Sequence, residues 1–108
     1  MRRYCFDIDG TICTNTWGDY EDAEPYYERI DTVNKMYDGG IHITYLTARG
    51  MGNCGGDVSC AYDRWYNFTY DQLTEWGCKF DDLILGKPHA DIYIDDKAFP
   101  DNLFFKNL

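Results

Sequence analysis

Short apolar runs alternate along this chain with longer segments whose apolar side chains recur at helical spacing. The runs are rich in β-branched and aromatic residues, which favours extended strands. They predict four strands, over residues 3–8, 41–46, 82–86 and 91–95. Two longer segments between them predict helices that connect one strand to the next.

Residues that start and stop helices bound both of these segments. Pro25 suits the first turn of a helix, and Gly39 with Gly40 suits its end. Asp57 suits the N-cap of a second helix, over about 58–76. The tail is apolar enough to dock on a core, but its pattern predicts no particular form.

The order strand, helix, strand, helix, strand, strand predicts an α/β domain with a mostly parallel central sheet. Right-handed crossovers would place helices on the faces of the sheet and give a Rossmann-like three-layer sandwich. The chain length of 108 residues fits a single domain, 1–108. Ligands in such sheets bind beyond the carboxyl ends of the strands, so we expect a site at that edge.

Charge and hydropathy narrow the range of partners. The chain has 10 basic and 19 acidic residues and a formal charge of −9, which disfavours nucleic acid and anionic lipid. A bound cation would neutralise part of the acidic excess. No apolar run approaches the ~20 residues that span a membrane. Because a strand follows Met1, Arg2 and Arg3 directly, we expect no signal peptide and a cytoplasmic protein.

The number and spacing of the cysteines also favour a cytoplasmic protein. There are five cysteines, an odd number, and no C-x-x-C pair occurs. This spacing argues against zinc and predicts free thiols in a reducing compartment. The five are Cys5, Cys13, Cys54, Cys60 and Cys78.

Every predicted strand ends in, or is followed by, polar or charged residues at the edge where a ligand would bind. These residues are Asp7 and Asp9, Thr47 and Arg49, Lys87, and Asp95 and Asp96. Asp7 and Asp9 are two residues apart, so both side chains leave the strand on the same side. The fold would therefore gather residues that are distant in sequence into one pocket.

The chemistry of such a pocket is specific. Four carboxylates in a small space raise one another's pKa or require a cation. Carboxylate and carbonyl oxygens suit Mg²⁺, and a lysine with a threonine suits an oxyanion such as phosphate. A metal site beside a phosphate cradle indicates phosphoryl chemistry, in which a carboxylate can also be the nucleophile.

These motifs resemble those of the haloacid dehalogenase-like phosphatases. The stretch "DIDGT" at 7–11 is similar to their D-x-D-G-T signature, and "YLTARG", with Thr47, is similar to their second motif. Lys87 in "LILGKP" resembles the third motif, and the acidic pair of "YIDD" at 93–96 resembles the fourth. The four motifs occur in order and together span residues 4–97.

The resemblance implies roles for the carboxylates. Asp7 would attack phosphorus and become an aspartyl-phosphate. Asp9 would protonate the leaving oxygen and then activate the hydrolytic water. Mg²⁺ would be held by Asp7, by the backbone carbonyl of Asp9 and by Asp95, with Asp96 in support.

The resemblance also implies a phosphate-binding set. Thr47 and Lys87 would bind the transferred phosphoryl group, helped by backbone N–H groups near Ile8 to Gly10. Arg49 stays open between two interpretations: it would contact the substrate, or it would pair with loop acids on the surface.

Many members of this family carry a cap domain over the site, whereas this chain resembles a capless member. Residues 48–81 fit one loop and one helix, and the loop after the first strand is short. Loops 12–24 and 48–56 would then supply specificity. Trp17 and Tyr20 in the first loop would either stack on a substrate ring or pack beneath the loop.

Three segments, "LTARGMG", "YDQLTEWG" and "LILGKPHADIYIDD", are similar to small phosphatases associated with capsule or surface-polysaccharide synthesis. The resemblance implies a Mg²⁺-dependent phosphomonoesterase with a small phosphorylated substrate, a sugar phosphate or a nucleotide-linked metabolite. Two alternatives stay open. One is a polynucleotide 3′-phosphatase, which the charge of −9 disfavours. The other is a binding module that keeps the fold without turnover.

Overall fold

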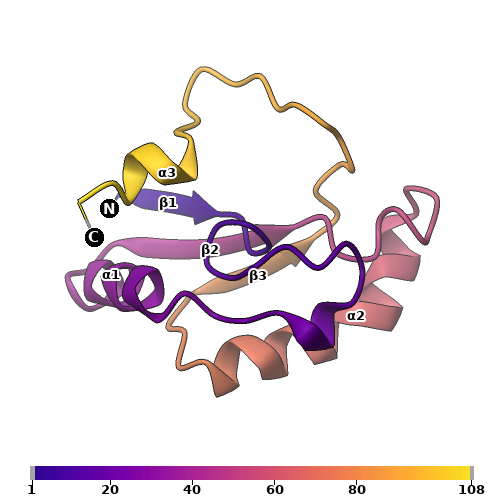
Figure 1. Ribbon diagram of the computed structural model, residues 1–108, viewed down its shortest axis with the longest axis horizontal. Helices are drawn as coiled ribbons and strands as arrows, with labels where there is room; N and C mark the ends of the chain where they lie inside the picture. Colours follow the sequence, from indigo (N-terminus) through magenta and orange to yellow (C-terminus); the bar gives the residue numbers. More distant parts are fainter. Residues whose placement is uncertain (1, 108) are drawn as a thin grey trace.

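The computed structural model describes residues 2–107, which form a three-stranded parallel sheet flanked by helices (Figure 1). The strands are β1 (Arg3–Phe6), β2 (His42–Thr47) and β3 (Asp82–Leu85), in the order β1-β2-β3. The helices are α1 (Tyr27–Asp38), α2 (Val58–Glu75) and α3 (Asp101–Phe104), and Tyr20–Asp22 forms a 3-10 helix. The chain thus adopts the predicted small Rossmann-like α/β fold.

Side-chain alternation decides which face of the sheet is buried. Ile43, Tyr45 and Thr47 of β2 are buried and alternate with partly exposed residues. Phe6 of β1 and Leu83 of β3 both pair with Tyr45 in the parallel register, so they share its face. This face becomes the core because its apolar side chains leave water together.

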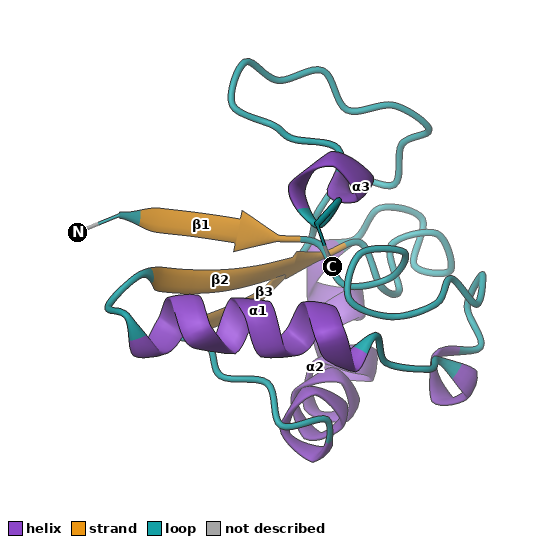
Figure 2. Cartoon of the chain, turned by 60° about the vertical axis from the view of Figure 1, so that its left-hand side comes forward, coloured by secondary structure: helices purple, strands orange, loops and turns teal. Residues whose placement is uncertain are grey.

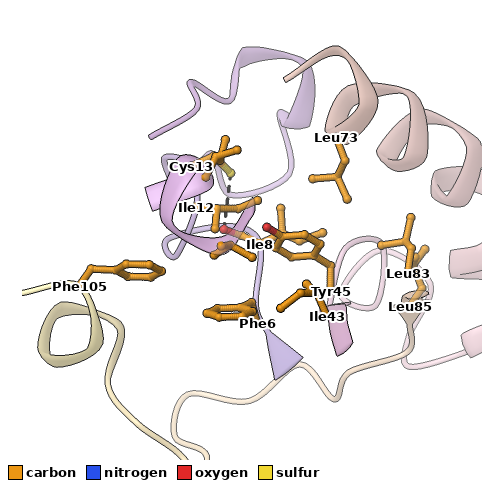
Figure 3. Close-up of a cluster of buried hydrophobic side chains, with 12 residues drawn as sticks. Phe6, Ile8, Ile12, Cys13, Ile43, Tyr45, Leu73, Leu83, Leu85 and Phe105 are labelled. Carbon is orange, nitrogen blue, oxygen red and sulfur yellow. Dashed lines mark hydrogen bonds between the residues drawn. The ribbon is translucent and has the colours of Figure 1, made fainter. Parts of the chain in front are cut away.

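Helices α1 and α2 complete the core. Ile30 and Val33 of α1 and Leu73 of α2 are at most 1% exposed and join the cluster formed by the sheet. Figure 3 shows Leu73 pointing from α2 toward the sheet residues. Each fully buried side chain of this size contributes about 1.5–3 kcal/mol relative to an exposed one.

The helix boundaries follow the predicted stop and start residues closely. The Asp57 carboxylate accepts a hydrogen bond from the backbone N–H of Cys60 at 3.3 Å, which confirms the N-cap. Helix α1 begins at Tyr27, two positions after Pro25. Gly40 follows its end with φ of +95°, a conformation that glycine adopts without steric cost.

The predicted fourth strand at 91–95 is wrong for this structure. Residues 86–100 instead form a long loop that leaves the sheet after β3 and returns at α3 (Figures 1 and 2). The side chains of Ile92 and Ile94 are 76% and 96% exposed. Strand propensity is outweighed here because ordering the backbone costs entropy that no burial offsets.

The tail docks on the core, as predicted, and does so through α3. The Phe104 ring lies 5.5 Å from that of Phe6 and 6.1 Å from that of Tyr4. Arg29 of α1 pairs with Asp101 at 2.7 Å and ties the tail to that helix. No helix within residues 2–107 is long and apolar enough to cross a bilayer.

Candidate active site

A cleft of about 360 Å³ lies at the carboxyl ends of the three strands. Asp7 and Asp9 reach it from the end of β1, Thr47 and Arg49 from the end of β2, and Lys87 from the segment after β3. The structure therefore brings together five of the residues that the strand ends predict. A volume of this size suits a small ligand.

Asp7 occupies an environment that disfavours its charge. Burial raises the pKa of its carboxyl above the usual value of 3.8, while the nearby Lys87 ammonium opposes this effect in part. The distance from Lys87 Nζ to Asp7 Oδ1 is 3.7 Å, so the ion pair is loose. A second positive charge beside Asp7 would favour the ionised form that a nucleophile needs.

Asp9 is held by Arg49 through a bidentate ion pair. Arg49 Nε donates to Asp9 Oδ2 and Arg49 Nη2 donates to Asp9 Oδ1, both at 2.9 Å. The arginine is only 1% exposed, whereas the Asp9 side chain is 19% exposed. Of the two interpretations left open for Arg49, the surface ion pair with loop acids is wrong, because the guanidinium is buried against Asp9.

The predicted phosphate-binding groups differ in whether they still have a hydrogen bond to donate to a ligand. The Thr47 hydroxyl oxygen lies in the cleft and accepts a hydrogen bond from the Arg49 backbone N–H at 3.1 Å, so its own proton can still be donated. The Gly10 backbone N–H already donates to the Cys13 carbonyl at 2.8 Å. Ile8 has a fully buried side chain, and its backbone hydrogen bond lowers the pKa of Asp7.

Gly10 is nevertheless required where it stands. Its φ is +82°, and a Cβ added there would lie 2.7 Å from the side-chain nitrogen of Asn15. Any larger residue would therefore push Asn15 out of the cleft that it lines.

Asp95 and Asp96 do not reach the cleft. Both are exposed and lie on the loop that replaces the predicted fourth strand. The Lys97 backbone N–H donates to Asp95 Oδ1 at 2.9 Å and lowers the pKa of that carboxyl, with a further contribution from Asp96. Within residues 2–107, no group of three or more His, Cys, Asp or Glu side chains converges on a metal position.

The cleft thus fits part of the ligand set expected for Mg²⁺. The desolvated Asp7 carboxylate is suited to a neighbouring cation. Both Asp9 carboxylate oxygens already accept hydrogen bonds from Arg49, which leaves the Asp9 backbone carbonyl as a ligand. Mg²⁺ commonly completes such a small protein set with water and substrate phosphate.

The first loop contributes two aromatic residues with different roles. Trp17 lines the mouth of the cleft, is 92% exposed and has φ of +52°, which is uncommon for a bulky residue. Tyr20 packs edge-on against Trp65 at 4.6 Å, and its hydroxyl accepts from the Gly50 N–H at 3.0 Å. Trp17 is therefore available to a ligand, and Tyr20 supports the loop.

Several lining residues carry no signal in the sequence. Asn15 and Asn53 reach the cleft from the two loops, and Tyr93 and His89 reach it from the loop after β3. Tyr93 lies beneath the Lys87 ammonium, 4.3 Å from the ring centre. Strand-end reasoning misses them because their positions depend on how the loops fold back.

The expectation of five free thiols is wrong. Cys54 and Cys60 form a disulfide with a Cα–Cα distance of 5.8 Å. The glycine-rich loop turns back so that Cys54 faces the first turn of α2, which a spacing rule does not reveal. Cys5, Cys13 and Cys78 are free, and burial raises the pKa of the Cys13 and Cys78 thiols to about 12. The disulfide removes the cysteine argument for a reducing compartment.

A second hollow, of about 430 Å³, lies near the opposite ends of the strands. Its walls include Tyr66, Tyr70 and Phe80, and its rim carries Asp81 and Asp82. Its lysine, Lys79, is already paired with Asp38 at 2.9 Å, and none of the residues that the strand ends predict lines it. We therefore place the candidate site at the carboxyl ends of the strands.

Comparisons with known proteins agree with the fold. No family model and no curated protein matches the chain. Among solved structures, the chain is similar to the crystal structure of a target protein from Vibrio cholerae, with 27% sequence identity and a TM-score of 0.87. The match covers 96% of this chain and 87% of the other. That structure is named as a target without an activity, so the likeness supports the α/β architecture and leaves the chemistry to be argued from the cleft.

Proposed function

We propose that this protein is a phosphomonoester hydrolase that forms a covalent phosphoryl-aspartate on Asp7. The observation that carries the proposal is the convergence of Asp7, Asp9, Thr47 and Lys87 on one cleft at the strand ends. A carboxylate nucleophile, a second carboxylate for proton transfer, an ammonium and a hydroxyl are the groups that phosphoryl transfer needs.

In the first step, a carboxylate oxygen of Asp7 attacks phosphorus, and the bond between phosphorus and the ester oxygen breaks. Asp9 enters this step with a proton on an oxygen lone pair that its contacts with Arg49 leave free. It gives that proton to the departing oxygen, so the product leaves as an alcohol. The Lys87 ammonium, 3.7 Å from Asp7 Oδ1, offsets the negative charge that collects there. The Thr47 hydroxyl donates to a phosphoryl oxygen.

In the second step, water attacks the phosphorus of the phosphoryl-aspartate. The Asp9 carboxylate accepts a proton from this water, and the bond between phosphorus and the Asp7 oxygen breaks. Inorganic phosphate leaves, and both carboxyl groups return to their starting protonation states.

Bound Mg²⁺ would neutralise charge on the phosphoryl oxygens. Asp7 and the Asp9 carbonyl would hold it from within the cleft. We propose Asp95 as a further ligand, because its loop already reaches the cleft at His89 and Tyr93.

A substrate panel with Mg²⁺ present tests the proposed function. It compares p-nitrophenyl phosphate, sugar phosphates, mononucleotides and a 3′-phosphorylated oligonucleotide. We expect hydrolysis of the aryl phosphate and of small phosphoesters, with little on the oligonucleotide, because the chain carries a charge of −9. A preference for the oligonucleotide would favour the 3′-phosphatase alternative, and no turnover at all would favour the binding module.

Trp17 provides a prediction about the leaving group. Because its ring is exposed at the mouth of the cleft, we expect Trp17→Ala to raise KM about three- to tenfold for substrates with a sugar or base ring, with kcat nearly unchanged. The measurement is steady-state kinetics on a ring-bearing phosphoester. Tyr27→Ala is the matched control, since Tyr27 is 58% exposed and does not line the cleft. Equal KM values for the Trp17 variant and the wild type would contradict a substrate contact.

A further inference from the structure

The guanidinium that holds Asp9 is itself held from three other sides. Arg49 Nη1 donates to Gln72 Oε1 at 2.7 Å and to Thr69 Oγ1 at 3.3 Å. The Tyr20 ring covers the guanidinium at 4.8 Å from its centre. A buried arginine needs all of its N–H groups paired, so these contacts decide where Asp9 is placed.

Gln72 is the residue that connects this buried arginine to the rim of the cleft. Its Oε1 accepts from Arg49, and its Nε2 donates to the Tyr20 backbone carbonyl at 2.8 Å. Both ends of the amide are therefore used, and a flipped amide would point its N–H groups at the guanidinium. The connection runs from the 3-10 helix of the first loop, through α2, to Asp9.

Resting on the proposed function, we propose that Gln72 is a positioning residue for proton transfer by Asp9. It does not line the cleft and does not contact Asp9, and it acts through Arg49. Without its oxygen, Nη1 keeps only the longer contact to Thr69, and the guanidinium turns to find another acceptor. The bidentate geometry at Asp9 is then lost, although Asp7, Thr47 and Lys87 are untouched.

The consequence depends on the leaving group. An aryl phosphate releases a stable phenolate and needs little help from a general acid, whereas an alkyl or sugar phosphate needs its oxygen protonated. A residue that positions Asp9 should therefore affect the second kind of substrate more strongly. A residue that only supports the fold should affect both kinds equally.

The experiment compares kcat/KM for p-nitrophenyl phosphate and for a sugar phosphate in the full-length chain. For Gln72→Met, which keeps the side-chain shape and removes the polar atoms, we expect about tenfold or greater loss on the sugar phosphate and less than about threefold on the aryl phosphate. Asp71→Asn, its exposed neighbour on α2, is the control and should change neither value.

A second variant keeps the test sharp if Gln72→Met folds poorly. Thr69→Val removes only the longer contact of Arg49 Nη1, at 3.3 Å, so its loss should also fall mainly on the sugar phosphate and be smaller than that of Gln72→Met. Equal losses on both substrates in either variant would overturn the inference while leaving the phosphatase intact. A wild-type protein that hydrolyses neither substrate would overturn the proposed function itself.

Discussion

Asp7→Asn should abolish hydrolysis of p-nitrophenyl phosphate and at the same time raise the melting temperature. The loss of turnover, at least about 10³-fold, follows because an amide cannot form the phosphoryl intermediate. The gain in stability follows because Asp7 is a partly desolvated carboxylate whose pKa is raised mainly by burial, and a neutral isostere avoids that cost.

The pH dependence of this gain is fixed in sign. A carboxyl whose pKa is raised in the folded state binds its proton more tightly there than in the unfolded chain. Its favourable contribution to the free energy of unfolding is present below pH 3.8 and is lost as the pH rises through the pKa of the folded state. The difference in melting temperature between Asp7→Asn and wild type should therefore be small near pH 3 and largest at neutral pH.

Thermal melts at several pH values and an aryl phosphate assay measure both effects. Asp63→Asn, an exposed aspartate on α2, is the matched control and should leave both unchanged. Turnover close to wild type in Asp7→Asn would remove Asp7 from the mechanism. A lower melting temperature at pH 7 would mean that the Lys87 ion pair outweighs desolvation.

EDTA should abolish phosphatase activity, and added Mg²⁺ should restore it. If Asp95 joins the metal, Asp95→Asn should raise the Mg²⁺ concentration for half-maximal activity by about 10- to 100-fold. Asp91→Asn is the control, because Asp91 is exposed on the same loop and changes the net charge equally. Activity that is indifferent to EDTA would contradict a metal requirement, and equal effects of the two variants would place Asp95 outside the metal site.

The residues at the strand ends show what the sequence could predict. Asp7, Asp9, Thr47 and Lys87 each follow an apolar run, and the topology of a parallel sheet brings such positions together whatever the loops do. The fold class was predictable for the same reason, since it depends on the order of elements. Local sequence patterns were enough to predict the position of a residue wherever that position depends only on the end of one strand.

The remainder depends on contacts between distant residues. The pattern of residues 91–95 is typical of a strand, but pairing requires a partner and burial, and Ile94 is 96% exposed. The bond between Arg49 and Gln72 spans 23 positions, and no local pattern relates an arginine after β2 to a glutamine in α2. The Cys54–Cys60 disulfide depends on how a glycine-rich loop folds back on a helix.

The disulfide affects the stability of the fold and the order of the loop at the cleft to different degrees. Its cysteines are six positions apart, so closing so short a loop restricts the unfolded chain modestly, by about 2 kcal/mol in the chain-entropy view. The same bond fastens the segment that carries Gly52 and Asn53, both at the cleft, to the start of α2. Glycine-rich backbone has many conformations to lose, and the cross-link removes many of them before a ligand arrives. Part of the entropy cost of ordering this loop around a ligand is thus already incurred when the chain folds.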